Sequence, residues 1–90
     1  MLKITRSNRF LKDLKLAIKR GMNVQELSDV VAILQQCKPL SSKYKDHPLQ
    51  GVYSDFRECH IEPNWLLIYR IDQDELKLLL FRTGTHSDLF

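Results

Sequence analysis

The pattern of apolar and polar positions changes twice along this 90-residue chain. Residues 2–6 alternate between apolar and polar side chains, which predicts a short strand. Apolar positions then recur at helical spacing in two segments, and after a polar stretch three apolar runs follow. The predicted order is therefore β-α-α-β-β-β.

The two helical segments carry signals for their ends. Ser7 can cap the first helix and Gly21 stops it. Asn23, followed by Glu26, resembles a capping box for a second helix that ends before Pro39. The positions expected to share one face of the first helix are Phe10, Leu14, Ala17 and Ile18. Together the segments predict a helical hairpin.

The C-terminal half predicts a β-meander. Strands are expected at about 54–61, 65–71 and 75–83, separated by turns, after an exposed loop over 39–51. The nearly continuous apolar run of 65–71 is typical of a central strand that is covered on both faces, and the short first strand suits a sheet margin. We expect an α+β fold in which the helical hairpin packs on a small, mainly antiparallel sheet, with residues 1–90 as a single domain.

Composition narrows the class of protein. No apolar run approaches the roughly 20 residues that span a bilayer, and the N-terminus lacks the hydrophobic region of a signal peptide, so a cytoplasmic location is expected. Cys37 and Cys59 show no CxxC spacing and are expected to be reduced. Cys59 and His60 are neighbours on a predicted strand and would point to opposite faces, and no further Cys/His cluster supplies a tetrahedral set, so no metal site is expected. No cofactor is expected either.

The charge is unevenly distributed. Residues 1–50 contain ten Lys and Arg against four Asp and Glu, whereas residues 51–90 contain four against seven. A basic N-terminal half attracts either phosphate backbones or an acidic protein partner, and charge alone leaves both open.

All three histidines lie in the second half, in the polar segments KYKDHPLQG, DFRECHIEP and RTGTHSDLF. Strand alternation places Glu58 and His60 on one face, where the carboxylate can orient the imidazole. Gly84 allows a tight turn that could bring His86 back to the strand end, near Arg82. An Arg and a His there would suit a phosphate, although scattered surface histidines are an open alternative.

The segments KYKDHPLQG, DFRECHIEPNWLLIYR and LFRTGTHSDLF, in this order, resemble the YafQ-type branch of the RelE/ParE superfamily of bacterial toxins. The resemblance implies a microbial-RNase-like fold and a ribosome-dependent mRNA interferase, the toxin of a type II toxin–antitoxin pair. In such metal-free cleavage the RNA 2′-OH attacks the adjacent phosphate, which requires a base, an acid and positive charge.

Carried over by position, His47 and His60 match acid–base histidines of YafQ-type toxins, and His86 matches a third that we favour as the general acid. His60 or His47 would be the base or its orienting group, Glu58 would support them, and Arg82 would stabilise the phosphate. The residues expected to bind substrate are Phe90, Asn64, Lys45 and Lys43.

Two of these positions, Phe90 and Asn64, allow a second interpretation. Phe90 could instead close the hydrophobic core. At Asn64 the chain departs from the family pattern, in which Asp can occur, so the negative charge there is missing. A weaker nuclease, or one that uses Glu58 or Glu62 instead, would be consistent with this change.

The resemblance also implies partners. A YafQ-type toxin is held inactive by an antitoxin that often has a ribbon-helix-helix DNA-binding part, and it acts on mRNA at the ribosome. Two other functions remain open: a ParE-like toxin that poisons a protein such as gyrase, and an RNA-binding module without activity. ParE-like relatives generally lack this histidine set, which argues against the first.

Overall fold

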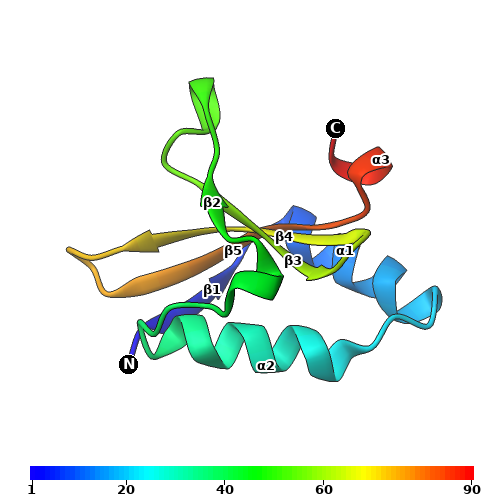
Figure 1. The fold of residues 1–90 in the computed structure, drawn as a ribbon, viewed down its shortest axis with the longest axis horizontal. Helices are drawn as coiled ribbons and strands as arrows, with labels where there is room; N and C mark the ends of the chain where they lie inside the picture. Colours follow the sequence, from blue (N-terminus) through cyan, green and yellow to red (C-terminus); the bar gives the residue numbers. More distant parts are fainter.

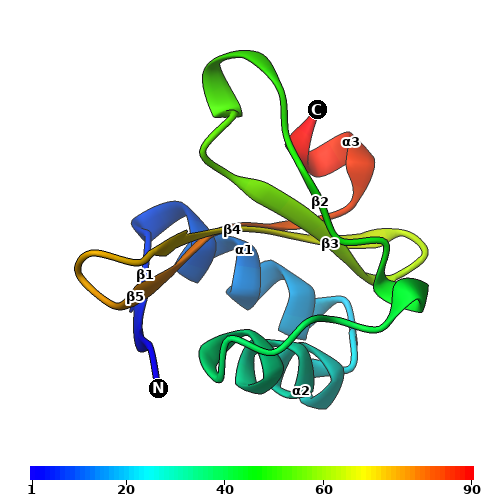
Figure 2. The ribbon, with the colours of Figure 1, turned by 60° about the vertical axis from the view of Figure 1, so that its left-hand side comes forward.

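The computed structural model describes residues 1–90 as a five-stranded sheet with two long helices on one of its faces (Figures 1 and 2). The elements are β1 (Lys3–Arg6), α1 (Asn8–Lys19), α2 (Val24–Gln35), the 3-10 turn η1 (Ser42–Tyr44), β2 (His47–Pro48), the 3-10 turn η2 (Gly51–Tyr53), β3 (Arg57–Glu62), β4 (Trp65–Asp72), β5 (Lys77–Gly84) and α3 (His86–Leu89). The predicted α+β class is confirmed, with one more strand than expected. None of the helices is both long and apolar enough to cross a membrane.

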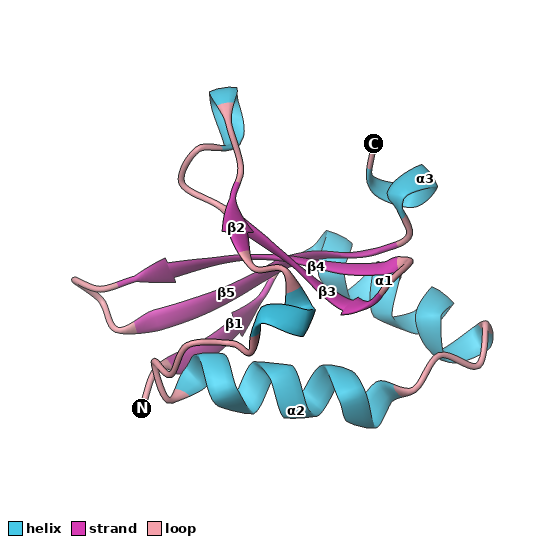
Figure 3. Cartoon of the chain, in the orientation of Figure 1, coloured by secondary structure: helices cyan, strands magenta, loops and turns pink.

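The strand order is β1-β5-β4-β3-β2 (Figure 3). β1 pairs in parallel with β5, and the other neighbours pair antiparallel. β4 is the middle strand, and its residues Trp65–Tyr69 are all buried. The prediction that the strand at 65–71 is central is therefore confirmed, as is the prediction that the short first strand lies at the margin of the sheet.

The core lies between the sheet and the two helices. Alternate side chains of each long strand face the helices, as the period of two requires. The strand residues of this core are Cys59, Ile61, Trp65, Leu67, Tyr69, Leu78 and Leu80, and they pack with helix residues that include Phe10, Ala17, Leu27, Val30 and Leu34. The other sheet face, toward which Glu58 and His60 alternate, carries these polar side chains beside the buried Ile68 and Leu66 with which they pair.

α1 has the boundaries that the sequence predicted, but one residue expected on its buried face is exposed. The Ser7 side chain accepts a hydrogen bond from the Phe10 amide at 2.9 Å, and Gly21 follows the helix with φ +76°. Ile18, expected on the buried face, is 56% exposed. The buried stripe runs through Phe10 and Ala17, and Ile18 lies about 100° further round the helix, toward solvent.

α2 is capped differently from the prediction. The Asn23 side chain accepts from the Gln25 amide at 3.1 Å, while the Glu26 amide donates to the backbone carbonyl of Asn23, so the expected capping box is absent. The helix ends at Gln35, where Cys37 adopts a left-handed φ of +59° ahead of Pro39.

Three local predictions in the second half need correction. The expected loop over 39–51 contains η1 and the short strand β2, and β3 begins at Arg57 instead of 54 because η2 precedes it. Gly84 makes no turn: it ends β5, and the chain turns into the unforeseen helix α3. A side chain at Gly84 would meet Asp88, since a Cβ there would lie 2.9 Å from its Oδ2.

Candidate active site

Strand pairing brings two of the three histidines together around one carboxylate. β2 pairs with β3 so that His47 lies opposite Glu58, and His60 follows on the same face of β3. The distances from Glu58 Oε1 are 3.3 Å to His47 Nε2 and 3.8 Å to His60 Nε2. Glu58 is only 6% exposed, and the polar side chains beside its carboxylate are these two imidazoles. Glu58 therefore orients both rings.

The third histidine comes from the C-terminal tail. α3 and the η2 loop lie on the sheet face opposite the long helices (Figures 1 and 2). From α3, the His86 ring reaches the His60 ring edge-on, with their centroids 5.8 Å apart. The sequence hypothesis that the histidines share one surface agrees with this geometry. Their catalytic roles remain a prediction.

The loop that carries His47 is fixed by its neighbour Asp46. One carboxylate oxygen accepts from the Tyr69 hydroxyl at 2.5 Å, and Arg57 donates to both oxygens at 3.3 Å. Burial, together with the hydrogen bond to Asp46, raises the pKa of Tyr69. The phenol thus remains a hydrogen-bond donor at physiological pH, and Asp46 holds the β2 segment against the sheet.

Replacing Asp46 by Ala is expected to lower the free energy of unfolding by about 1–3 kcal/mol, because the buried Tyr69 hydroxyl loses its acceptor. Asp46→Asn is the matched control, since the amide oxygen can still accept that hydrogen bond. Chemical denaturation of the two variants measures the difference. Equal loss in both variants would contradict this assignment and point to the charge on Arg57 instead.

The tail that carries His86 is held by Asp88. Asp88 accepts from the Thr85 amide at 2.9 Å while the Thr85 hydroxyl accepts from the Asp88 amide at 3.2 Å, which makes a capping box. Arg20, at the end of α1, donates to both Asp88 oxygens at 2.6 and 3.2 Å. The hydrogen bonds from Arg20 lower the pKa of Asp88 strongly. We call this set of contacts the tail clamp.

The tail clamp gives a pH-dependent prediction. Because the pKa of Asp88 is lowered in the folded state, its ionised form stabilises the protein above the unfolded value of about 3.9. Asp88→Asn is therefore expected to lower the Tm slightly at pH 7, and the difference from wild type should shrink below about pH 4. Thermal melts between pH 7 and pH 3 check the trend, and a difference that widens on acidification would contradict it.

Arg82 has a carboxylate partner that the sequence did not indicate. Its guanidinium donates to both oxygens of Asp13 on α1, at 2.8 and 3.1 Å, and the Thr83 amide donates to the same carboxylate at 3.1 Å. These contacts fasten the end of β5 to α1. Contact of Arg82 with a phosphate remains a prediction, and it would compete with Asp13 for the guanidinium.

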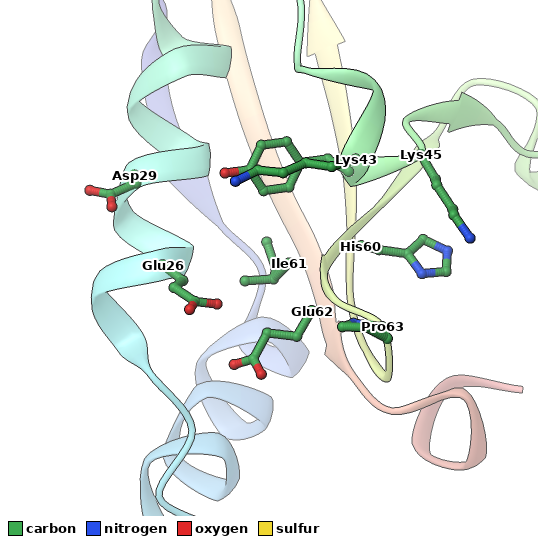
Figure 4. A pocket seen from close by; sticks show the side chains of 9 residues that line it. Glu26, Asp29, Lys43, Lys45, His60, Ile61, Glu62 and Pro63 are labelled. Carbon is green, nitrogen blue, oxygen red and sulfur yellow. The ribbon is translucent and has the colours of Figure 1, made fainter.

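The predicted substrate-binding residues lie near the surface. Phe90 is 68% exposed, so the alternative that it closes the core is wrong. Lys43 places its ammonium 5.0 Å from the centroid of the Tyr44 ring, and Lys45 extends toward the His60 ring (Figure 4). Asn64 is exposed in the turn between β3 and β4. Trp65, in contrast, is core, as expected.

Cys59 and the histidine cluster lie on different sides of the sheet. Cys59 is fully buried in the core, and burial raises the pKa of its thiol to about 12, so it is neither a nucleophile nor a partner of His60. Both cysteines are free. Potential ligand atoms of His47, Glu58 and His60, however, all lie within 4.8 Å of one another. The sequence reasoning missed this donor set because it depends on the pairing of β2 with β3.

The sequence reasoning also missed the supporting residues Asp13, Arg20, Asp46 and Asp88. Arg20 and Asp88 are 68 residues apart, and Asp13 and Arg82 are 69 apart, so no local pattern links them. The sequence does contain one weak signal for this tail: Thr85 and Asp88 have the spacing of a capping box at the start of a helix.

Comparisons with known proteins agree with the fold and identify the family. Residues 2–90 match the family model described as the bacterial toxin of type II toxin–antitoxin system, YafQ. The mRNA interferase toxin YafQ of Escherichia coli strain K12 is 45% identical over 86 residues, which cover 93% of this chain and 90% of that relative.

Solved structures show the same architecture. The crystal structure of a metal-bound toxin from Helicobacter pylori superposes with a TM-score of 0.95 at 50% identity, with all of both chains covered. YafQ in the DinJ–YafQ complex of E. coli gives a TM-score of 0.91 at 41% identity, over 100% of this chain and 99% of that one. The chain belongs to the YafQ family of bacterial toxins of type II toxin–antitoxin systems.

Proposed function

We propose that this toxin is an endoribonuclease that cleaves mRNA at the ribosome by metal-free acid–base catalysis. The observation that carries the proposal is the convergence of His47 and His60 on Glu58, with the His86 ring 5.8 Å from that of His60. Relatives named mRNA interferase toxin support the substrate class. A non-nuclease toxin that poisons a protein has no need of three imidazoles on one face.

The geometry favours a division of roles. His60, oriented by Glu58, is placed to take the proton from the RNA 2′-OH, whose oxygen then bonds to phosphorus. His86, on the tail, would give a proton to the departing 5′-oxygen, leaving a 2′,3′-cyclic phosphate. Both ring nitrogens of His47 face oxygen atoms, the Pro48 carbonyl and Glu58, so this ring suits a supporting role. Lys45 and Arg82 supply positive charge for the phosphorane.

The test is cleavage of mRNA by the purified chain on programmed ribosomes in the presence of EDTA. We expect products with 2′,3′-cyclic phosphate and 5′-hydroxyl ends, since the nucleophile is the RNA itself. Cleavage that EDTA abolishes, or 5′-phosphate products, would overturn the metal-free mechanism. Growth arrest with intact mRNA would favour the protein-poisoning alternative.

A cognate antitoxin is the second partner that we propose. The relative from E. coli is held in a DinJ–YafQ toxin–antitoxin complex. In this chain, exposed lysines of α1 offer a surface that attracts an acidic segment: Lys12, Lys15 and Lys19. The same lysines would face ribosomal RNA phosphates in the active toxin, so the two partners would compete.

We further propose that the histidine cluster binds a divalent transition metal, as the H. pylori relative is metal-bound. Two imidazole nitrogens and one carboxylate oxygen within 4.8 Å fit the preferences of zinc or copper and leave positions open for other ligands. The bound ion would supply Lewis acidity and occupy the lone pairs of His47 and His60.

Metal binding should therefore inhibit cleavage. Calorimetric titration with Zn²⁺ is expected to show one site in the wild-type protein, and His47→Ala should weaken it by roughly 10-fold or more. Tyr53→Phe, outside the donor set, is the control. Undiminished affinity in His47→Ala would contradict this site.

A further inference from the structure

A hollow of about 590 Å³ lies between α2 and the free edge of β3 (Figure 4). β2 covers only Arg57 and Glu58 of β3, so the segment from His60 to Glu62 has no strand on that side. The volume is within the range of about 300–1,000 Å³ that is typical of small-molecule sites. We call this hollow the edge pocket, and its lining includes Glu26, Lys43, Tyr44, Lys45, His60 and Glu62.

The edge pocket adjoins the proposed catalytic cluster through His60, which lines it. Lys45, beside His60 in Figure 4, adopts a left-handed φ of +49° at the end of η1. That backbone conformation favours glycine, so the surrounding structure holds Lys45 there at a cost in backbone strain. Because His60 lines the edge pocket, an RNA whose scissile phosphate lies at His60 has a neighbouring nucleotide close to this pocket.

The charges in the edge pocket are divided between its two ends. Lys45 lies at the His60 end, whereas the Glu26 and Glu62 side chains point into the space between α2 and β3 (Figure 4). The Lys43 side chain runs the other way from Lys45, toward α2 and over the Tyr44 ring. Neither glutamate forms a hydrogen bond or ion pair with another side chain. The Tyr44 ring, whose face holds the Lys43 ammonium, packs against the core and makes a rigid wall. A ligand that is anionic at one end and a hydrogen-bond donor at the other matches this lining.

We propose that the edge pocket binds the nucleotide next to the scissile phosphate and selects bases that carry an exocyclic amino group. Lys45 neutralises its phosphate at the His60 end, and Glu26 and Glu62 accept hydrogen bonds from the amino group. Uracil presents a carbonyl oxygen in place of that group, which two carboxylates repel. The inference extends the proposed RNA cleavage, since His60 is what brings the RNA to the pocket.

Nucleotide binding tests the pocket without requiring cleavage. The probes are two pairs that differ in an amino group against a carbonyl: cytidine and uridine monophosphates, and adenosine and inosine monophosphates. NMR titration of the wild-type chain is expected to give roughly 10-fold tighter binding for the amino member of each pair, with shifts at Ile61 and Glu62. Glu62→Gln and Glu26→Gln should bring both ratios close to one, because an amide also donates to carbonyls.

Glu75→Gln is the matched control, because Glu75 is an exposed carboxylate that pairs with Lys77 away from the pocket. It should leave the ratios unchanged. Equal binding within each pair by the wild type, or a preference that survives both pocket substitutions, would overturn the inference. If the preference is found but the ribosome assay shows no cleavage, the nuclease proposal fails and the nucleotide site stands. If the wild type cleaves mRNA but shows no preference, the nucleotide site fails and the nuclease proposal stands.

Discussion

Replacing His86 by Ala is expected to lower mRNA cleavage by about 10²–10⁴-fold, the range for loss of a general acid. The ring is exposed at the first position of α3, so the substitution removes little packing. Alanine is tolerated at that helical position, and the free energy of unfolding should change by less than about 0.5 kcal/mol. Activity and stability are thereby separated. Single-turnover cleavage on ribosomes and thermal melts of the same samples measure the two effects.

His60→Ala and His47→Ala complete this comparison. His60 lies between Glu58 and His86 and contacts both, so we expect its loss to match that of His86, while loss of His47 should cost less. Losses of this kind need not add, because the imidazoles act as one unit. If His86→Ala cleaves at the wild-type rate and still arrests growth, His86 has no part in the chemistry.

Gly84→Ala is expected to reduce cleavage by about 10²-fold, although residue 84 contacts no substrate. A Cβ at this position would lie 2.9 Å from Asp88 Oδ2 and 3.0 Å from Asp88 Cβ. Asp88 must then move, and its hydrogen bonds to Arg20 and to the Thr85 amide weaken together. The tail clamp loosens and His86 leaves its position beside His60. The core lies on the other face of the sheet, so most of the stability should remain.

The control for this prediction is the Asp88→Gly background, which removes both Asp88 atoms, the Oδ2 and the Cβ, that a Cβ at residue 84 would approach to 2.9 and 3.0 Å. If the clash is the cause, Gly84→Ala should cost much less activity in that background than in the wild type, a coupling that a double-mutant cycle measures. NMR signals of the tail amides should broaden or shift in the single variant. Full additivity of the two substitutions would contradict the steric explanation.

Secondary structure was largely accessible from the sequence because its signals are local. The cap at Ser7, the stop at Gly21 and the apolar run of Trp65–Ile71 each depend on residues close together in the sequence. The wrong secondary-structure and burial predictions occurred where the local sequence signal was short or where tertiary contacts overrode it. β2 has only two residues and exists because β3 pairs with it, and Ile18 is exposed because the sheet covers a narrower stripe of α1 than its apolar pattern suggests.

The family, the α+β class, the candidate histidines and the shared face of Glu58 and His60 were all determined by the sequence alone, because motifs and strand alternation are properties of neighbouring residues. Only the tertiary structure decided that His47 meets Glu58 and that His86 meets His60. It alone also decided that Arg20 holds the tail and that Asp13 fastens the end of β5. The exposed position of Phe90 and the edge pocket are likewise consequences of the tertiary structure. Each of these depends on contacts between residues far apart in the chain, whose positions are set by sheet register and helix packing.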